Sequence, residues 1–497
     1  MTAAPPKGLA SRSISALKWS YAGMATKAVT QFAIGIVLAH LLGPAPFGVV
    51  AIAWTIIGFC NLVADFGFSA ALVQREQLTE RDLRFVSTCQ VALGASLTAA
   101  GIALAGPIAG FFHRPDATGV LRAMACLFVL QSLGQAALAT LRRGLDFKRL
   151  QLLDIGSYAT AYLAIGIPAA YLGCGAWSLA LAALAQTLLN SVGALVVTRT
   201  SLRPAFSADS SGMFRYGAKV IGANLTSWGL ANLDTLFVGR VLGLVDLGYY
   251  NRANNLVAAP MYSFIIGFQG VLFSSASRAQ ADRDALGRTY QAALMLAGLV
   301  CLPLFVTVAV VASSTIAGLY GIEWLAAAPV LAPMSLAMAA TVLLAISGPL
   351  LMSIDRVGLE LRLQMVALAL FVGGLVATCH SSMATIAWVF CGAACVRGYL
   401  LTAAVVAELG MRWTAVARAL RWPVVVAILV AAPAYAIDHV LAFAPIVHLG
   451  CVVATAAGCL LLCTRLLGPS MFVSSLGSDV AVLRDALPMP LRRFLRL

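Results

Sequence analysis

The chain carries the stretch LLGPAPFG at residues 41–48, and a related stretch, VLGLVDLG, returns 200 positions later at residues 241–248. The match continues without a gap to position 72 of the first copy, and seven of the 32 aligned residues are identical. Each copy lies between two long apolar runs, at the same place in the order of such runs. The repeat therefore predicts two halves with the same internal succession of helices.

The composition shows which solvent these halves face. Of 497 residues, 61% are hydrophobic and only 10% are charged. A membrane-spanning helix needs about 20 apolar residues. A window of about 19 residues predicts fourteen such helices, at 16–42, 48–73, 85–112, 118–141, 151–172, 175–198, 216–241, 249–275, 289–313, 324–353, 361–379, 383–407, 422–443 and 446–467. We therefore predict an all-α integral membrane protein with about 14 transmembrane helices.

The repeat divides these helices into six, six and an appended pair. Because six is an even number, both halves enter the membrane in the same orientation, which is the parallel-repeat plan of some secondary transporters. The predicted domains are an N-lobe at 1–198, a cytoplasmic linker at 199–215, a C-lobe at 216–407, the appended helices at 408–467 and a basic cytoplasmic tail at 468–497. The runs 216–241 and 249–275 are rich in Asn, Ser and Tyr, so we expect them to face a wet environment.

The positive charges predict the orientation. With a cytoplasmic N-terminus, 27 of the 33 Lys and Arg residues fall in cytoplasmic segments. This pattern obeys the positive-inside rule and places both termini in the cytoplasm. Because the cations lie next to the predicted spans, we interpret the net charge of +14 as favouring contact with anionic lipid and not with nucleic acid. Residues 1–15 lead directly into a full-length apolar run, so we expect no cleaved signal sequence.

Three motifs resemble those of a known family: Asp65–Arg75, the Leu42-Gly43-x4-Gly48 turn and Gly248–Ala253. Over about residues 15–465, the chain is similar to the polysaccharide-transporter branch of the multidrug/oligosaccharidyl-lipid/polysaccharide exporter superfamily, and more narrowly to Wzx-type flippases of lipid-linked oligosaccharides. The resemblance implies two six-helix lobes that form a V around a central cavity and alternate between inward-open and outward-open states. It also implies a bacterial inner membrane, lipid-linked oligosaccharide and membrane lipids as partners, and a role beside polysaccharide polymerase and chain-length machinery.

Two cations lie deep inside apolar runs. Lys27 shares a helix face with Gln31, and Arg397 lies in the middle of the run 383–407. A charge at the bilayer centre costs roughly 2.5 kcal/mol or more, so such residues usually line a cavity or find a partner. We expect Lys27 and Arg397 to bind the anionic part of a substrate, and we include Gln31 among the substrate-binding residues of the cavity. The alternative for Lys27 is a side chain that reaches the membrane interface from a shallower position.

One polar face follows the run 216–241, where Asn224, Ser227 and Asp234 recur at helical spacing. Such a face suits water or sugar hydroxyls better than lipid, and we include all three residues among the substrate-binding candidates. Hydrogen bonding between helices is the alternative explanation.

Four further residues are candidates for gating or ion coupling. Asn61 and Asp65 are one helical turn apart, and Asp65 can act as a coupling carboxylate, as a partner of Lys27 or as a contact at a helix end. Arg240 and Arg252 bracket the turn at 241–248, where they can close an outer gate against Asp246 or Asp234 or guide a leaving pyrophosphate.

The sequence therefore favours a flippase that moves undecaprenyl-pyrophosphate-linked oligosaccharides by alternating access. An ion-coupled antiporter of drugs or organic cations, or a lipid II flippase, is the alternative within the superfamily. We expect no enzyme and no catalytic residues, because no paired carboxylates, Ser/His pair or metal-ligand spacing occurs. Eleven scattered cysteines form no CxxC motif, so we expect no metal or other cofactor, while coupling to H+ or Na+ stays open.

Overall fold

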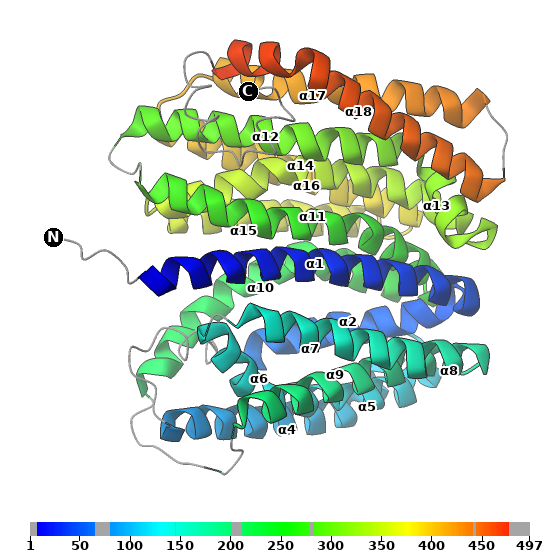
Figure 1. The fold of residues 1–497 in the computed structure, drawn as a ribbon. Coiled ribbons are helices and arrows are strands. Elements are labelled where there is room, and N and C mark those ends of the chain that lie inside the picture. Colours follow the sequence, from blue (N-terminus) through cyan, green and yellow to red (C-terminus); the bar gives the residue numbers. More distant parts are fainter. Residues whose placement is uncertain are drawn as a thin grey trace. The chain divides into compact units, whose positions relative to one another are not determined.

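The computed structural model describes residues 7–64, 80–144, 146–200, 204, 211–278, 282–440 and 444–476. Within these ranges all regular secondary structure is helical, and no strand occurs (Figure 1). The prediction of an all-α fold is therefore confirmed.

The helices follow the predicted runs closely. The first part of the chain forms α1 (Lys7–Leu42), α2 (Pro44–Ala64), α4 (Glu80–Phe111), η1 (Pro115–Ala117), α5 (Thr118–Ala125), α6 (Leu127–Arg143), α7 (Phe147–Ala161), η2 (Tyr162–Gly166), α8 (Ile167–Tyr171), α9 (Ala176–Thr198), α10 (Ser211–Val241) and α11 (Leu244–Arg278). The remainder forms α12 (Arg283–Val310), α13 (Ala312–Tyr320), η3 (Ile322–Ala327), α14 (Ala328–Ser353), α15 (Val357–Ala377), α16 (Met383–Glu408), α17 (Trp413–Val440) and α18 (Pro445–Leu476).

Each of the fourteen predicted runs overlaps a described helix. Among the described residues, twelve helical segments are long and apolar enough to cross a membrane. The two runs with the weakest hydropathy, now α10 and α11, are helical but are not among the twelve. The chain is thus a multi-pass membrane protein, and the count of fourteen spans stays a prediction.

Two predicted helices are interrupted well inside their bounds. The run 118–141 is divided at Cys126 into α5 and α6. The run 151–172 contains a π-helical turn, η2, directly before Pro168. Because proline has no N–H and its ring crowds the carbonyl four residues earlier, a wider turn at this place relieves the helix.

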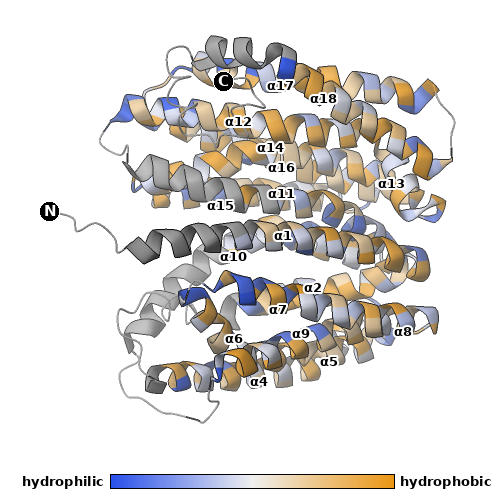
Figure 2. Ribbon diagram, viewed as in Figure 1, coloured by the Kyte–Doolittle hydropathy of each residue, from blue (hydrophilic) through white to orange (hydrophobic). Residues whose placement is uncertain are grey.

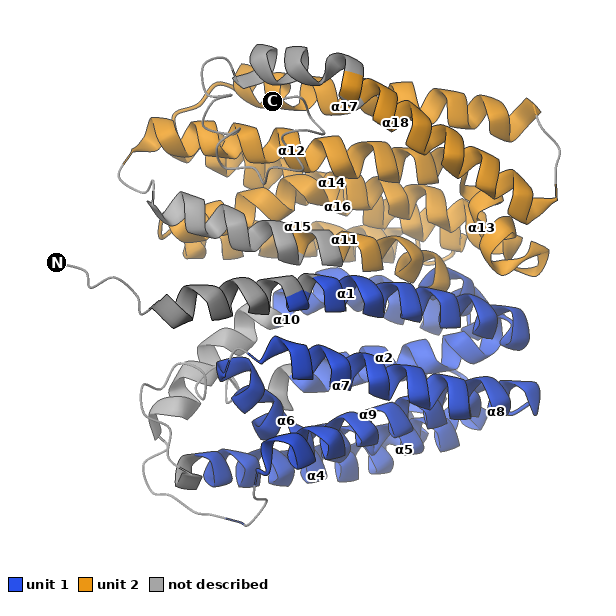
Figure 3. Cartoon of the chain, viewed as in Figure 1, with its two compact units in different colours: residues 1–251 blue, residues 252–497 orange. Residues whose placement is uncertain are grey.

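The chain packs as two compact units, residues 1–251 and 252–497 (Figure 3). In the first unit, α7 packs against α1 and α9, α6 against α4 and α9, and α2 against α10. In the second, α14 packs against α12 and α16, and α17 packs against α12 and α18. The unit boundary lies inside α11, so α10 belongs to the first unit; the predicted domain limits stay a prediction.

Small residues and backbone oxygens make the close contacts between helices. Gly134 of α6 lies against Ser191 of α9, whose hydroxyl donates to the Leu130 carbonyl at 2.7 Å. In a bilayer the hydrophobic effect does not drive such contacts, so close packing and hydrogen bonds do. Large apolar side chains such as Leu163 and Ile428 remain exposed, and hydrophobic residues run along most helices of both units (Figure 2), as expected for surfaces that contact lipid.

Candidate functional site

A charged contact in the first unit joins α1, α7 and α9. Lys27 of α1 donates from Nζ to Asp154 Oδ2 of α7 at 2.6 Å. The other carboxylate oxygen of Asp154 accepts a hydrogen bond from Asn190 Nδ2 of α9 at 3.4 Å. The two charged side chains are 30% and 24% exposed, so the pair is not sealed inside the unit. Lys27 therefore lies in a polar cluster with a partner that the sequence analysis did not predict.

The packing of α1 against α7 places this cluster. Gly23 of α1 lies directly against the side chain of Gln151, where a larger residue would overlap with it. Gln151 is only 8% exposed, and no hydrogen bond from the described residues reaches its Oε1. Gln31, one turn beyond Lys27, is exposed. Because Gly23 has no side chain, α1 can approach α7 closely enough for Lys27 to reach Asp154.

The polar face of α10 is open at one end and covered at the other. Ser227 is exposed, whereas Asp234 is only 1% exposed. The hydroxyl of Tyr250 on α11 donates to Asp234 Oδ2 at 2.7 Å. Asp234 Oδ1 is buried, and no hydrogen bond from the described residues reaches it. Nothing is described of the Asn224 side chain.

Arg397 belongs to a chain of polar groups in the second unit. It donates from Nη2 to Gln364 Oε1 on α15 at 3.3 Å, and Gln364 Nε2 donates to Glu360 Oε1 at 3.0 Å. The amide of Gln364 therefore connects a guanidinium to a carboxylate. Arg397 Nε is buried and makes no hydrogen bond with the described residues, which leaves a donor for a further acceptor.

For two of the predicted gate residues, Arg240 and Arg252, the structure describes contacts that the sequence does not predict. Arg240 donates to the Phe111 carbonyl at the end of α4 and contacts the His113 ring nitrogens at 2.7 Å. The Arg252 guanidinium lies 5.0 Å from the centre of the Tyr320 ring. Asn61 is half-buried on α2, and Asp65 lies outside the described residues. The gate role of these residues stays a prediction.

The two copies of the repeated stretch meet within the first unit. A Cβ atom at Gly48 of α2 would overlap with the Leu244 carbonyl, and a Cβ atom at Gly248 of α11 would overlap with the Pro44 carbonyl. Each helix follows a glycine in the left-handed region, Gly43 (φ 66°) or Gly243 (φ 97°). The repeat thus produces a reciprocal contact that glycine alone permits.

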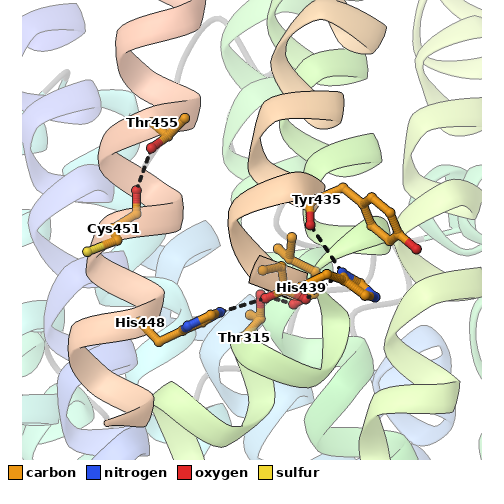
Figure 4. A network of polar contacts seen from close by, with 8 residues as sticks. Thr315, Tyr435, His439, His448, Cys451 and Thr455 are labelled. Carbon is orange, nitrogen blue, oxygen red and sulfur yellow. Dashed lines mark hydrogen bonds and ion pairs between the residues drawn. The ribbon is translucent and has the colours of Figure 1, made fainter. Parts of the chain in front are cut away.

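A further polar network lies where α17 is followed by α18 (Figure 4). His448 donates from Nε2 to Asp438 Oδ1 at 2.9 Å, and both side chains are largely buried. His439 donates to the Tyr435 carbonyl at 3.1 Å. The sequence analysis missed this network, because only the fold brings Asp438 and His448 together. No group of three or more potential metal ligands occurs among the described residues.

Comparisons with known proteins agree with the predicted resemblance. Residues 37–329 match a family model described as "Polysaccharide biosynthesis protein". Teichuronic acid biosynthesis protein TuaB of Bacillus subtilis is 28% identical over 346 residues, which cover 67% of this chain and 69% of the relative. Lipopolysaccharide biosynthesis protein WzxC of Escherichia coli is 25% identical over 382 residues, which cover 74% of this chain and 75% of the relative.

One solved structure shares the fold over nearly the whole chain. The lipid II flippase MurJ, in an inward closed conformation, superimposes with a TM-score of 0.71 at 10% sequence identity. The match covers 91% of this chain and 99% of that chain. At this identity the likeness establishes the fold.

Proposed function

Because the chain belongs to the polysaccharide biosynthesis protein family, we propose that it is a flippase, which moves undecaprenyl-pyrophosphate-linked oligosaccharide repeat units to the periplasmic leaflet of a bacterial inner membrane. The observation that carries the proposal is the family match over residues 37–329. The WzxC relative and the flippase-like fold support the same class.

Lys27 and Arg397 supply the chemistry that such a substrate needs. Each lies well inside a helix and keeps donor capacity after its described contacts: two N–H groups of the Lys27 ammonium and the Nε of Arg397. A pyrophosphate presents several strong acceptor oxygens, and charge-assisted hydrogen bonds to it are stronger than neutral ones. In the proposed mechanism each of these cations binds anionic groups of the substrate while the lipid tail stays in the bilayer.

Alternating access requires a contact that closes and opens. The reciprocal packing of Gly48 and Gly248 supports a role for the two repeated turns as that contact. Gln31 and Ser227, which are exposed, and Asn224 are proposed to meet sugar hydroxyls. Arg240 and Arg252 are proposed to act near the outer end, with Asn61 and Asp65 near the inner end.

Asp65 and Asp234 are the proposed sites of ion coupling, if H+ or Na+ drives transport. Burial of Asp234 together with an oxygen that receives no described hydrogen bond supports this role for Asp234. We propose no catalytic residue and no cofactor. Cytoplasmic termini and cooperation with a polysaccharide polymerase belong to the same proposal.

A drug or organic-cation antiporter is the second candidate, since Asp234 is an embedded carboxylate, the kind of group that a site for cations needs. A lipid II flippase is a third, supported by the similarity of fold to MurJ. Embedded cations favour an anionic substrate over an organic cation.

The test is translocation of fluorescent lipid-linked oligosaccharide in proteoliposomes. We expect Lys27→Ala or Arg397→Ala to slow flipping about tenfold or more, because each removes charge-assisted hydrogen bonds to the head group. The matched controls Lys148→Ala and Arg418→Ala remove exposed cations and should flip at the normal rate.

Absence of flipping, together with ion-driven efflux of organic cations, would transfer the protein to the antiporter class. Flipping of lipid II at equal rate would identify the peptidoglycan substrate instead. Normal flipping by both folded variants would retain the function and overturn the assignment of these two cations.

A further inference from the structure

We propose that Asp154 determines the charge selectivity of the Lys27 site. In the absence of substrate, its carboxylate forms a salt bridge with the Lys27 ammonium, and an anionic group of the substrate replaces this carboxylate on binding. This inference rests on the proposed function and deepens it. It assigns to Asp154 a positioning and competing role, with Asn190 as the residue that holds the carboxylate. The ligand class is a phosphate-bearing head group.

The geometry shows that Asp154 and a substrate anion need the same atom. Asp154 Oδ2 lies 2.6 Å from Lys27 Nζ, which is a short charge-assisted hydrogen bond. A phosphate at hydrogen-bond distance from the same ammonium would approach this carboxylate closely. Like charges placed side by side cost several kcal/mol at an interface, so the two anions do not share the site without loss. Binding therefore requires the carboxylate to move away.

The surroundings show that the exchange is sterically open. Lys27 and Asp154 are 30% and 24% exposed, whereas Gln151, one turn earlier on α7, is 8% exposed. The pair thus has one side against packed helices and one side that no described residue covers.

Asn190 contacts the other carboxylate oxygen of Asp154. Its Nδ2 lies 3.4 Å from Asp154 Oδ1, at the long limit of a hydrogen bond, and this contact tightens if the carboxylate turns away from Lys27. Asn190 Oδ1 is buried without a hydrogen bond from the described residues, as is Gln151 Oε1. These two oxygens are acceptors, so they match hydroxyl donors of a sugar or of ordered water rather than a second anion.

The resting pair also explains how a lysine can remain in the membrane between transport cycles. An unpaired cation within a span is costly, and Asp154 offsets that cost when the substrate is absent. The site is therefore close to neutral when empty and gains an anion only by exchange. Neutral amphiphiles would gain nothing from the exchange.

The test measures binding of farnesyl pyrophosphate and of neutral farnesol to the full-length protein in detergent, by calorimetry. Asp154→Asn keeps the shape and removes the competing charge, so we expect farnesyl pyrophosphate to bind about tenfold more tightly. Lys27→Ala should weaken binding about tenfold, and the double variant Lys27→Ala/Asp154→Asn should resemble Lys27→Ala, since Asp154 acts through Lys27. Farnesol should bind equally to all of them.

The matched control is Asp146→Asn. This residue lies on the same helix, where it caps the start of α7 by accepting from the Arg149 N–H, and asparagine keeps that capacity. The Asp146→Asn variant should bind farnesyl pyrophosphate and farnesol with the same affinities as the unchanged protein. In proteoliposomes, Asp154→Asn should lower the KM for lipid-linked oligosaccharide and also lower kcat, because release is slowed when no carboxylate returns to Lys27.

Equal or weaker binding of farnesyl pyrophosphate to folded Asp154→Asn would overturn the inference, as would tighter binding that persists without Lys27. A lower Tm with no difference between the two probes would identify a purely structural salt bridge and would also overturn it. If the binding pattern holds but no lipid-linked oligosaccharide is flipped, the inference stands and the proposed function fails. If lipid-linked oligosaccharide is flipped normally but the binding pattern is absent, the proposed function stands and the inference about Asp154 fails.

Discussion

At the scale of single residues, Asp234 shows how an embedded carboxylate is held. Tyr250 donates to one of its oxygens at 2.7 Å, and both side chains are almost completely buried. Loss of a hydrogen bond to a buried charged group costs about 1–3 kcal/mol. We therefore expect Tyr250→Phe to lower the Tm of the detergent-solubilised protein by several degrees. Tyr171→Phe, which alters an exposed ring, should leave the Tm unchanged. An unchanged Tm in Tyr250→Phe would show that Asp234 does not depend on this hydroxyl.

Single residues also show where sequence reasoning ends. Lys27, Asp234 and Arg397 stand out in the sequence because charge is rare in long apolar runs. Their partners do not stand out. Asp154, for example, is 127 positions from Lys27 and lies near the start of the predicted run 151–172, where a charged residue is common. Helical spacing relates residues of one helix, and it carries no information about which helices become neighbours. The embedded charges were predictable, but the polar clusters around them were not.

At the scale of helices, the repeated glycines make a prediction of their own. A Cβ atom at Gly48 would overlap with the Leu244 carbonyl, whereas a Cβ atom at Gly156 of α7 meets nothing within 4 Å. Gly48→Ala should therefore force the starts of α2 and α11 apart and lower stability by about 1–3 kcal/mol. Gly156→Ala should raise stability by up to about 1 kcal/mol, since alanine favours a helix.

Thermal unfolding and the flipping assay measure both glycine variants. If the reciprocal contact is the outer closure, Gly48→Ala and Gly248→Ala should slow flipping similarly, since each disturbs the same contact from one side. Normal stability and normal flipping in both variants would contradict this role. Strong slowing in Gly156→Ala, whose new methyl group has open space, would show that the assay responds to any change of glycine.

Helix positions were largely predictable, whereas their internal breaks were not. Hydropathy locates apolar runs because it measures preference for lipid, and each predicted run overlaps a described helix. It does not register the break at Cys126 or the π-helical turn before Pro168, because both are changes of backbone hydrogen bonding within an apolar segment. The repeat at 41–48 identified the two glycines as equivalent positions, but their reciprocal contact became visible only in the fold.

At the scale of the whole molecule, the distribution of charge makes the membrane potential a decisive variable. The chain carries 33 basic and 19 acidic residues, and the positive-inside rule predicts that most of the basic ones face the cytoplasm. An anionic head group that moves outward across a membrane that is negative inside gains about 2.3 kcal/mol per charge per 100 mV. That energy corresponds to roughly a 50-fold shift in the distribution of the substrate for each charge moved.

We therefore expect the final ratio of lipid-linked oligosaccharide between the leaflets to follow a potassium diffusion potential of about 100 mV in proteoliposomes. A neutral head group should equilibrate without regard to the potential, and an organic cation should move in the opposite direction. If substrate charge alone is moved, the ratio responds to the potential and is indifferent to pH and to sodium gradients. A ratio that follows a proton or sodium gradient instead would contradict uncoupled transport. In that case Asp234→Asn, which removes a buried carboxylate but keeps its shape, tests whether the coupled ion uses that site.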